Sequence, residues 1–213
     1  MSRIPRPLAT LVLALVLLFA PAIEARFNPL ASIAPLHHVK SDGSSQFHCT
    51  AWATTLGNGM RVWATAAHCL MGTAPPELLT WTIGGKPATP MAWDFKLDLA
   101  YLTGGSAAQP LQLAFVSPKP LQYIYAAGYP GGSVDVHVSV GAWSTTQDVE
   151  GLAVYSLAVA GGMSGSPILD KGGVVVGLMQ QMHEMCSIEW RAGSWCPMSR
   201  GASTETLRKF LGY

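Results

Sequence analysis

Short runs of hydrophobic residues, separated by clusters of glycine, proline, serine and asparagine, extend from about residue 47 to residue 181. Such runs between turn-forming residues are typical of antiparallel β structure, whereas βαβ units would place amphipathic helices between the strands. Asn58-Gly59 predicts a tight hairpin, because both residues tolerate the positive φ that such turns require. The pattern predicts strands over residues 47–55, 61–66, 78–83, 99–103, 122–127, 134–140, 153–158, 167–169 and 174–181.

Three further segments differ from this pattern. Residues 27–35 are expected to form an irregular lead before the first strand. Prolines 118 and 120 mark the segment 114–120 as a connector between two β-rich halves, because proline lacks the N–H donor that a central strand needs. Leu207, Phe210 and Leu211 recur at helical spacing, which predicts one short helix near the C-terminus.

The first 25 residues have a basic start, an apolar run from residue 8 to residue 20 and a small-residue exit. These are the three parts of a secretory signal peptide, and the run is shorter than the roughly 20 apolar residues that cross a bilayer. We therefore expect residues 1–25 to be a signal peptide, residues 26–213 to be the exported domain, and the protein to be secreted or periplasmic. Membrane contact is then transient, through the signal peptide, and an uncleaved signal anchor is the alternative.

Composition supports a folded, exported domain. The chain has 213 residues, 49% of them hydrophobic and 12% charged, with a formal net charge of +1. A disordered chain would have fewer apolar residues, and a nucleic-acid partner would call for clustered Lys and Arg, so we expect no nucleic acid to bind. Four cysteines in an oxidising compartment favour two disulfides over metal ligation, with three pairings possible.

The candidate nucleophile is Ser164, within the glycine-rich segment 161–167. Gly162 would let the backbone approach a substrate carbonyl without a Cβ in the way, and Gly165 permits a tight conformation behind the serine. The backbone N–H groups of Gly162 and Ser164 could then converge as an oxyanion hole. Such a stretch alone is more often a simple turn, so the assignment depends on partners elsewhere in the chain.

Two segments supply such partners. A serine hydroxyl needs a neighbouring imidazole to take its proton, and His68 lies among small residues next to Cys69. Asp98 begins an apolar strand, where a carboxylate is costly unless it is paired, and orienting a histidine ring is such a pairing. Asp94 is a nearby rival, but no apolar strand follows it directly.

Together these segments resemble the trypsin/chymotrypsin-like serine proteases. That family carries a histidine, an aspartate and a serine motif in this chain order, and the matching residues are Ala66-Ala67-His68-Cys69, Asp98-Leu99-Ala100-Tyr101-Leu102 and Gly162-Met163-Ser164-Gly165-Ser166-Pro167. The resemblance implies an all-β fold of two packed six-stranded antiparallel β-barrels with a short C-terminal helix. It also implies a serine endopeptidase with His68, Asp98 and Ser164 as its triad, acting on protein or peptide substrates without cofactor or metal.

The resemblance further implies a disulfide between Cys49 and Cys69 behind the histidine, and a second between Cys186 and Cys196. The primary pocket should be walled by residues 157–161 and 176–180, and the expected lining residues are Ala158, Gly177, Leu178 and Met179.

Two departures from animal trypsins are clear. Met163 stands where those enzymes have the aspartate that binds a new N-terminus, so activation through that ion pair is not expected. Ala158 stands where trypsin has its pocket aspartate, so an uncharged residue before the scissile bond is favoured.

Two alternatives remain open. His137 or His183 could instead favour an acidic residue before the scissile bond. The chain could be a catalytically silent protease-like binding module. A third hypothesis, a metal-binding β domain that uses His37, His38, His48 and Cys49, fails on context, because the histidines lie close together in the irregular lead and Cys49 has a better partner.

Overall fold

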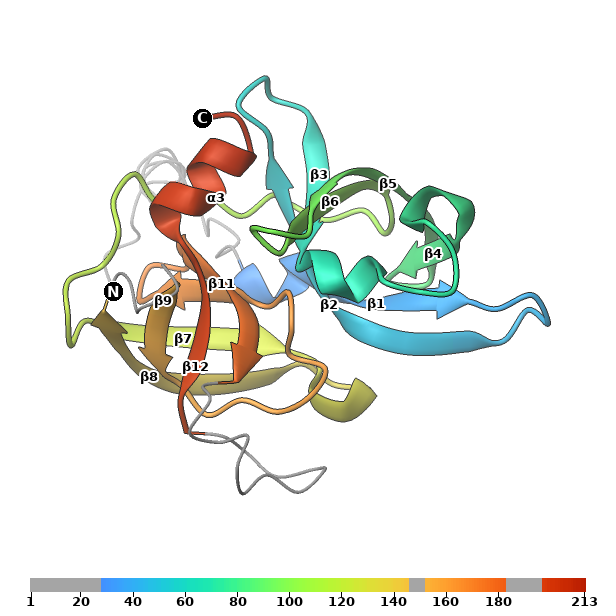
Figure 1. The fold of residues 1–213 in the computed structure, drawn as a ribbon. Coiled ribbons are helices and arrows are strands. Elements are labelled where there is room, and N and C mark those ends of the chain that lie inside the picture. The colour runs from blue at the N-terminus through green and yellow to red at the C-terminus, as the bar shows by residue number, and fades with distance from the viewer. Residues whose placement is uncertain (1–27, 146–151, 183–196) are drawn as a thin grey trace, which may run out of the picture.

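Two closed antiparallel β-barrels, each of six strands, form the molecule (Figure 1). The computed structural model describes residues 28–145, 152–182 and 197–213. The first barrel contains β1 (Ile33–Val39), β2 (Ser45–Thr55), β3 (Arg61–Thr65), β4 (Thr80–Ile83), β5 (Lys86–Asp94) and β6 (Leu99–Gly104). The second contains β7 (Tyr123–Gly128), β8 (His137–Thr145), β9 (Ala153–Ser156), β10 (Pro167–Asp170), β11 (Val175–Met182) and β12 (Ser199–Ser203). The expected fold is therefore confirmed.

Four 3-10 turns and one α-helix complete the described elements. They are η1 (Pro29–Ser32), η2 (Ala67–Leu70), η3 (Pro76–Leu78), η4 (Pro130–Gly132) and α3 (Thr204–Phe210). Within the described ranges, no helix is long and apolar enough to cross a membrane. The segment 105–122 links the last strand of one barrel to the first strand of the other, and it includes the expected connector at 114–120.

Three strands were not expected from the hydrophobic pattern. The prediction of an irregular segment over residues 27–35 is wrong for residues 33–35, because β1 begins at Ile33 and pairs with both β2 and β4. β5 contains Pro90, which lies where the pairing with β6 shifts register, the kind of irregularity that accepts a proline. β12 consists of small and polar residues that are all buried. In each case tertiary pairing overrides a weak local strand preference.

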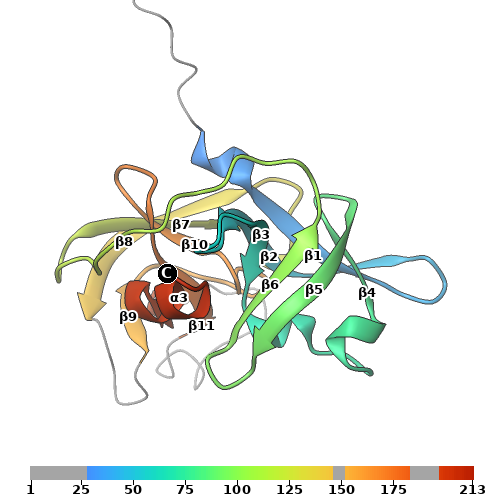
Figure 2. The same cartoon turned by 90° about the horizontal axis from the view of Figure 1, so that it is seen from above.

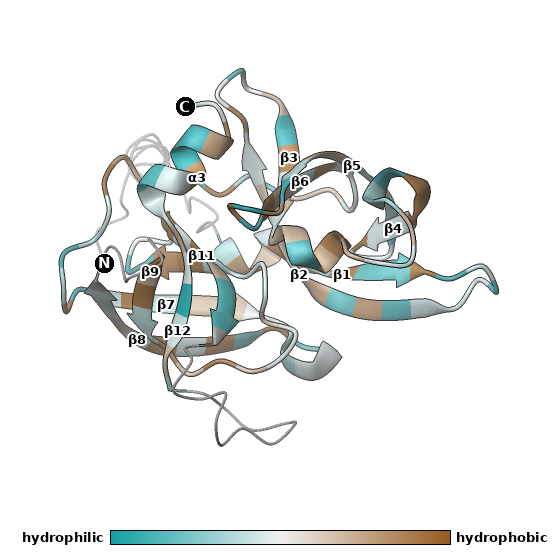
Figure 3. Cartoon of the chain, in the orientation of Figure 1, coloured by the Kyte–Doolittle hydropathy of each residue, from teal (hydrophilic) through white to brown (hydrophobic). Residues whose placement is uncertain are grey.

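The interior is divided between the two barrels. Ile124, Trp143 and Tyr155 belong to the core of the second barrel, and the ring centroids of Trp143 and Tyr155 lie 5.0 Å apart. The larger core fills the first barrel around Trp52 and Trp81 and continues across the contact between the barrels. Hydrophobic and hydrophilic positions alternate along parts of β1 and β2 (Figure 3), and residues 49–54 of β2 are buried on both faces.

Helix α3 fastens the second barrel to the first. It follows β12, and the Ser203 hydroxyl caps it by accepting a hydrogen bond from the N–H of Thr206 at 3.3 Å. Leu207 on this helix is buried, and the Phe210 ring lies against Tyr101 of β6. Figure 2 shows α3 above the second barrel, on the side that faces the first. The two barrels therefore hold a fixed relative position, which matters because the candidate site uses residues from both.

Candidate active site

The three expected catalytic residues come from both barrels. His68 lies in η2, directly after β3, and Asp98 immediately precedes β6, so the first barrel supplies both. Ser164 lies in the turn that leads into β10 of the second barrel. His68 and Asp98 are 30 positions apart and are brought together by the pairing of β3 with β6, whereas Ser164, 66 positions after Asp98, belongs to the other barrel.

His68 and Asp98 form a doubly hydrogen-bonded pair. Asp98 Oδ2 lies 2.8 Å from His68 Nδ1, and Asp98 Oδ1 accepts the backbone N–H of His68 at 2.8 Å. Both oxygens of one carboxylate thus hold the same residue, one through its ring and one through its backbone. A carboxylate at Nδ1 favours the tautomer with the proton on Nδ1 and leaves Nε2 as the basic nitrogen.

The Ser164 hydroxyl has a different partner. Its Oγ donates to the backbone carbonyl of Gln180 at 3.2 Å, and no hydrogen bond joins it to His68 in the part of the chain that the structure describes. The backbone carbonyl of Ser164 accepts the N–H of Thr50 at 3.0 Å. The backbone of the candidate nucleophile is therefore anchored to β2, while its hydroxyl points to β11.

The backbone around Ser164 leaves two N–H groups available. Within the described ranges, the N–H groups of Gly162 and Ser164 donate to no acceptor, as an oxyanion hole requires. The carbonyl of Gly161 accepts the N–H of Gly131 at 2.6 Å. Because the C=O and N–H of a trans peptide point in opposite directions, this bond turns the N–H of Gly162 away from η4.

Gly162 and Gly165 are required by space as well as by backbone conformation. Gly162 has φ +94°, and a Cβ there would lie 2.6 Å from the carbonyl oxygen of Tyr129. Gly165 has φ +82°, and a Cβ there would lie 2.2 Å from the carbonyl oxygen of Thr50. Any other L residue would combine a strained φ with a backbone clash, so this turn depends on glycine at both positions.

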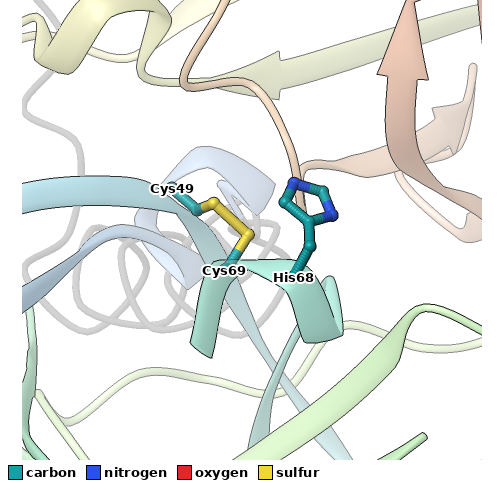
Figure 4. A group of neighbouring side chains, drawn as sticks. All are labelled: Cys49, His68 and Cys69. Atoms are coloured by element: carbon teal, nitrogen blue, oxygen red, sulfur yellow. A yellow bond between two sulfur atoms is a disulfide. The ribbon is translucent and has the colours of Figure 1, made fainter. Parts of the chain in front are cut away.

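A disulfide fixes the histidine turn to the neighbouring strand. The expected bond between Cys49 of β2 and Cys69 of η2 is present, and both residues are buried (Figure 4). The expected pair Cys186 and Cys196 lies outside the described residues. Cys49, His68 and Cys69 bring three potential metal ligands within 4.8 Å of one another. Both sulfurs are used in the disulfide, so this group cannot supply the thiolates that a metal site would need.

His38 and His48 form an aromatic group with Trp81 on the first barrel, whereas the His37 ring lies against Phe47. The His38 and His48 rings contact each other and both contact Trp81, with ring centroids 5.3 to 5.8 Å apart. Burial lowers the pKa of His48, a hydrogen bond to the Cys69 backbone opposes this shift, and the neighbouring histidines add to it. Cys49 is oxidised, so the proposed metal set of three histidines and this thiol is not available.

A cavity of about 210 Å³ opens beside Ser164. Its lining residues are Val159, Ala160, Gly161, Met163, Ser164, Met179, Gln180 and Gln181, and none of them is charged. Met163, at the position where animal trypsins have the activation aspartate, is fully buried in this wall.

The cavity includes only part of the expected pocket lining. Met179 lies on the cavity, whereas Ala158, Gly177 and Leu178 do not. Neighbouring strand residues point to opposite faces, so Leu178 enters the larger core while Met179 faces the cavity. His137 is exposed at the start of β8 and is not among the lining residues, and His183 lies outside the described residues.

Comparison with known proteins assigns the family. The model of the trypsin-like peptidase domain matches residues 49–178. The chain belongs to this family. The matched range includes His68, Asp98 and Ser164. None of the curated proteins matches the sequence.

Solved structures share the fold at low sequence identity. The active form of the Rv3671c protease from M. tuberculosis is 18% identical, with a TM-score of 0.64 over 91% of this chain and 84% of that one. Its inactive form gives 17% identity and a TM-score of 0.61 over 91% of this chain and 92% of that one. The HtrA-type protease AlgW with a decapeptide is 15% identical, with a TM-score of 0.65, and the match covers 85% of this chain and 63% of AlgW.

Proposed function

We propose that this peptidase-family chain is an exported serine endopeptidase that uses Ser164, His68 and Asp98 as its catalytic triad. The observation that carries the proposal is the pairing of His68 Nδ1 with Asp98 at 2.8 Å, which leaves Nε2 of the ring as a base. The N–H groups of Gly162 and Ser164, which donate to no acceptor among the described residues, support it further.

In this mechanism, the Ser164 hydroxyl rotates from the Gln180 carbonyl to His68 and gives its proton to Nε2 as Oγ attacks the substrate carbonyl carbon. The N–H groups of Gly162 and Ser164 stabilise the oxyanion of the tetrahedral intermediate. His68 then protonates the departing amine, which leaves an acyl-enzyme. A water molecule, deprotonated by His68, hydrolyses this ester and restores Ser164.

The cavity beside Ser164 supports a preference for an uncharged residue before the scissile bond. Its lining consists of aliphatic groups, methionines and uncharged polar side chains, so a charged substrate side chain would lose its hydration without gaining an oppositely charged partner. Digestion of a peptide library checks this preference, and cleavage concentrated after Arg, Lys, Asp or Glu would contradict it.

The N-terminal segment supports export. We propose that residues 1–25 are removed on secretion or on transfer to a periplasm, because their basic start, apolar run and small-residue exit suit a signal peptidase. N-terminal sequencing of the protein recovered outside the cytoplasm should begin between about residues 23 and 26. Recovery of the intact N-terminus in the membrane fraction would contradict cleavage.

Covalent labelling tests the triad. A fluorophosphonate that reacts with activated serines should add one label to the wild-type protein and none to Ser164→Ala, as measured by intact mass. Ser166→Ala is the matched control, because Ser166 is fully buried and its hydroxyl has no hydrogen-bond partner in the described structure, so labelling should persist.

A catalytically silent binding module is the second candidate, because the Ser164 hydroxyl faces Gln180 and not His68. Absence of label from the wild-type protein, or label that survives Ser164→Ala, would support this candidate and overturn the triad.

A further inference from the structure

Gln180 lies on β11 of the second barrel and is 3% exposed. Gln180 contacts two segments that carry proposed catalytic residues. One is the turn that contains Ser164, in the same barrel, and the other is the segment with Asp98 that precedes β6 of the first barrel. A glutamine is rarely buried to this degree unless its amide is satisfied. The hydrogen bonds of the Gln180 amide therefore explain why this side chain can be buried.

The Gln180 amide crosses to the first barrel. Its Nε2 donates to the backbone carbonyl of Leu97 at 2.7 Å and to that of Asp98 at 2.9 Å. A primary amide has two N–H donors, so both are used on two successive carbonyls. One side chain thus binds the two backbone carbonyls on either side of the Asp98 Cα. A serine or threonine hydroxyl has one donor and could not donate to both.

The backbone that Gln180 binds has an unusual conformation at Asp98. Asp98 has φ +51°, a left-handed conformation that L residues other than glycine adopt at an energetic cost. This conformation turns the Leu97 and Asp98 carbonyls toward the second barrel, and it lets both carboxylate oxygens reach His68. The hydrogen bonds from Gln180 favour this conformation over extended ones, because they are made only when both carbonyls face β11.

The backbone of the same residue contacts the proposed nucleophile. The Gln180 carbonyl accepts the Ser164 hydroxyl at 3.2 Å. One residue of β11 is therefore hydrogen-bonded to the serine through its main chain and to the Asp98 segment through its side chain. Among the described residues, these contacts link all the proposed catalytic segments, since Asp98 in turn holds His68.

We propose that Gln180 is a positioning residue: its amide fixes the backbone of Asp98 across the contact between the barrels and thereby sets the orientation of the His68 ring. This inference rests on the proposed triad. The amide acts through Asp98, so its loss should lower kcat because the base is misoriented. Gln180 also lines the cavity beside Ser164, and an effect of the substitution on substrate binding in that cavity should appear in KM instead.

Three substitutions separate these effects. Gln180→Met keeps the length and volume of the side chain but removes both donors. Gln180→Asn keeps the donors on a side chain one carbon shorter, so it should reach one carbonyl at most. Gln112→Met is the matched control, because Gln112 is exposed in the segment that links the barrels. Kinetics with a peptide substrate and proton NMR of the His68 Nδ1–H are measured for each.

For Gln180→Met, kcat should fall by about 10- to 100-fold, the scale expected when a catalytic group is displaced by a fraction of an ångström, with little change in KM. The His68 Nδ1–H resonance should broaden or vanish as the ring loses its carboxylate. Gln180→Asn should recover part of kcat, and Gln112→Met should match the wild type. If Gln180→Met does not fold, Gln180→Leu, which also lacks donors, takes its place.

Wild-type kcat together with an unchanged His68 resonance in the donor-free variant would overturn the proposal, as would a loss confined to KM. The NMR readout needs no turnover. If the wild-type protein is inactive, the proposed function fails, yet a change of the His68 resonance on substitution of Gln180 still supports the positioning role.

Discussion

Gly162→Ala should nearly abolish catalysis while the fold survives. The added Cβ would lie 2.6 Å from the Tyr129 carbonyl oxygen and 2.9 Å from the Gly131 nitrogen. Ordinary van der Waals contact begins at about 3.4 Å, so the loop must move by roughly 0.5 to 1 Å, or its 161–162 peptide must rotate. Rotation would break the hydrogen bond from Gly131 to Gly161 and turn the Gly162 N–H out of the proposed oxyanion hole.

The expected size of the effect follows from the lost donor. Removal of one oxyanion-hole donor costs about 10²- to 10³-fold in kcat, or about 3 to 4 kcal/mol of transition-state stabilisation. Gly161→Ala is the informative comparison, because a Cβ there meets no atom within 4 Å. It should lower kcat far less, although its place on the cavity wall can alter KM.

Steady-state hydrolysis of a peptide ester measures kcat for both variants, and thermal unfolding shows whether each is folded. A folded Gly162→Ala protein whose kcat lies within about tenfold of the wild-type value would refute the assignment of the Gly162 N–H to the oxyanion hole.

Two further predictions concern stability. The double substitution Cys49→Ala and Cys69→Ala removes a bond across a sequence separation of 20 and should lower the free energy of unfolding by about 3 kcal/mol, measured by urea denaturation; an unchanged denaturation midpoint would contradict this estimate. The pKa of His48 is lowered from 6.5, chiefly by burial, so the unfolded chain binds a proton more readily than the folded protein. The contribution of His48 to stability is therefore fully present above pH 6.5 and is lost as the pH falls below it. Melting temperatures from pH 8 to pH 5 should fall less steeply for His48→Gln than for the wild type, and parallel curves would show that His48 does not contribute.

The local motifs could be identified from the sequence because each one depends on a few neighbouring residues. The alternation of hydrophobic and turn-forming residues predicted an all-β chain, and the two barrels confirm it. The bond between Cys49 and Cys69 is also confirmed. Glycines 162 and 165 could be recognised for the same reason, since their neighbours in the motif already indicate a tight turn.

Other features depend on contacts between distant segments. β5 and β12 lack a strong local strand pattern, and they become strands because neighbours in a closed barrel satisfy their backbone groups. The cavity lining differs from expectation because the pairing of β11 turns Leu178 into the larger core and Met179 into the core of the second barrel, where it borders the cavity. A displacement of one residue reverses every side chain in a strand.

The sequence by itself determined which residues are available for chemistry, their order along the chain, and the class of fold that presents them. The tertiary structure alone decided that Asp98 adopts a left-handed backbone conformation and that the Gln180 amide donates to the Leu97 and Asp98 carbonyls of the other barrel. It also decided that the Ser164 hydroxyl donates to the Gln180 carbonyl. A sequence motif reflects what a short segment requires: a particular backbone conformation or a particular side chain. Contacts between residues 82 or 83 positions apart arise only when two barrels pack, and no local pattern encodes them.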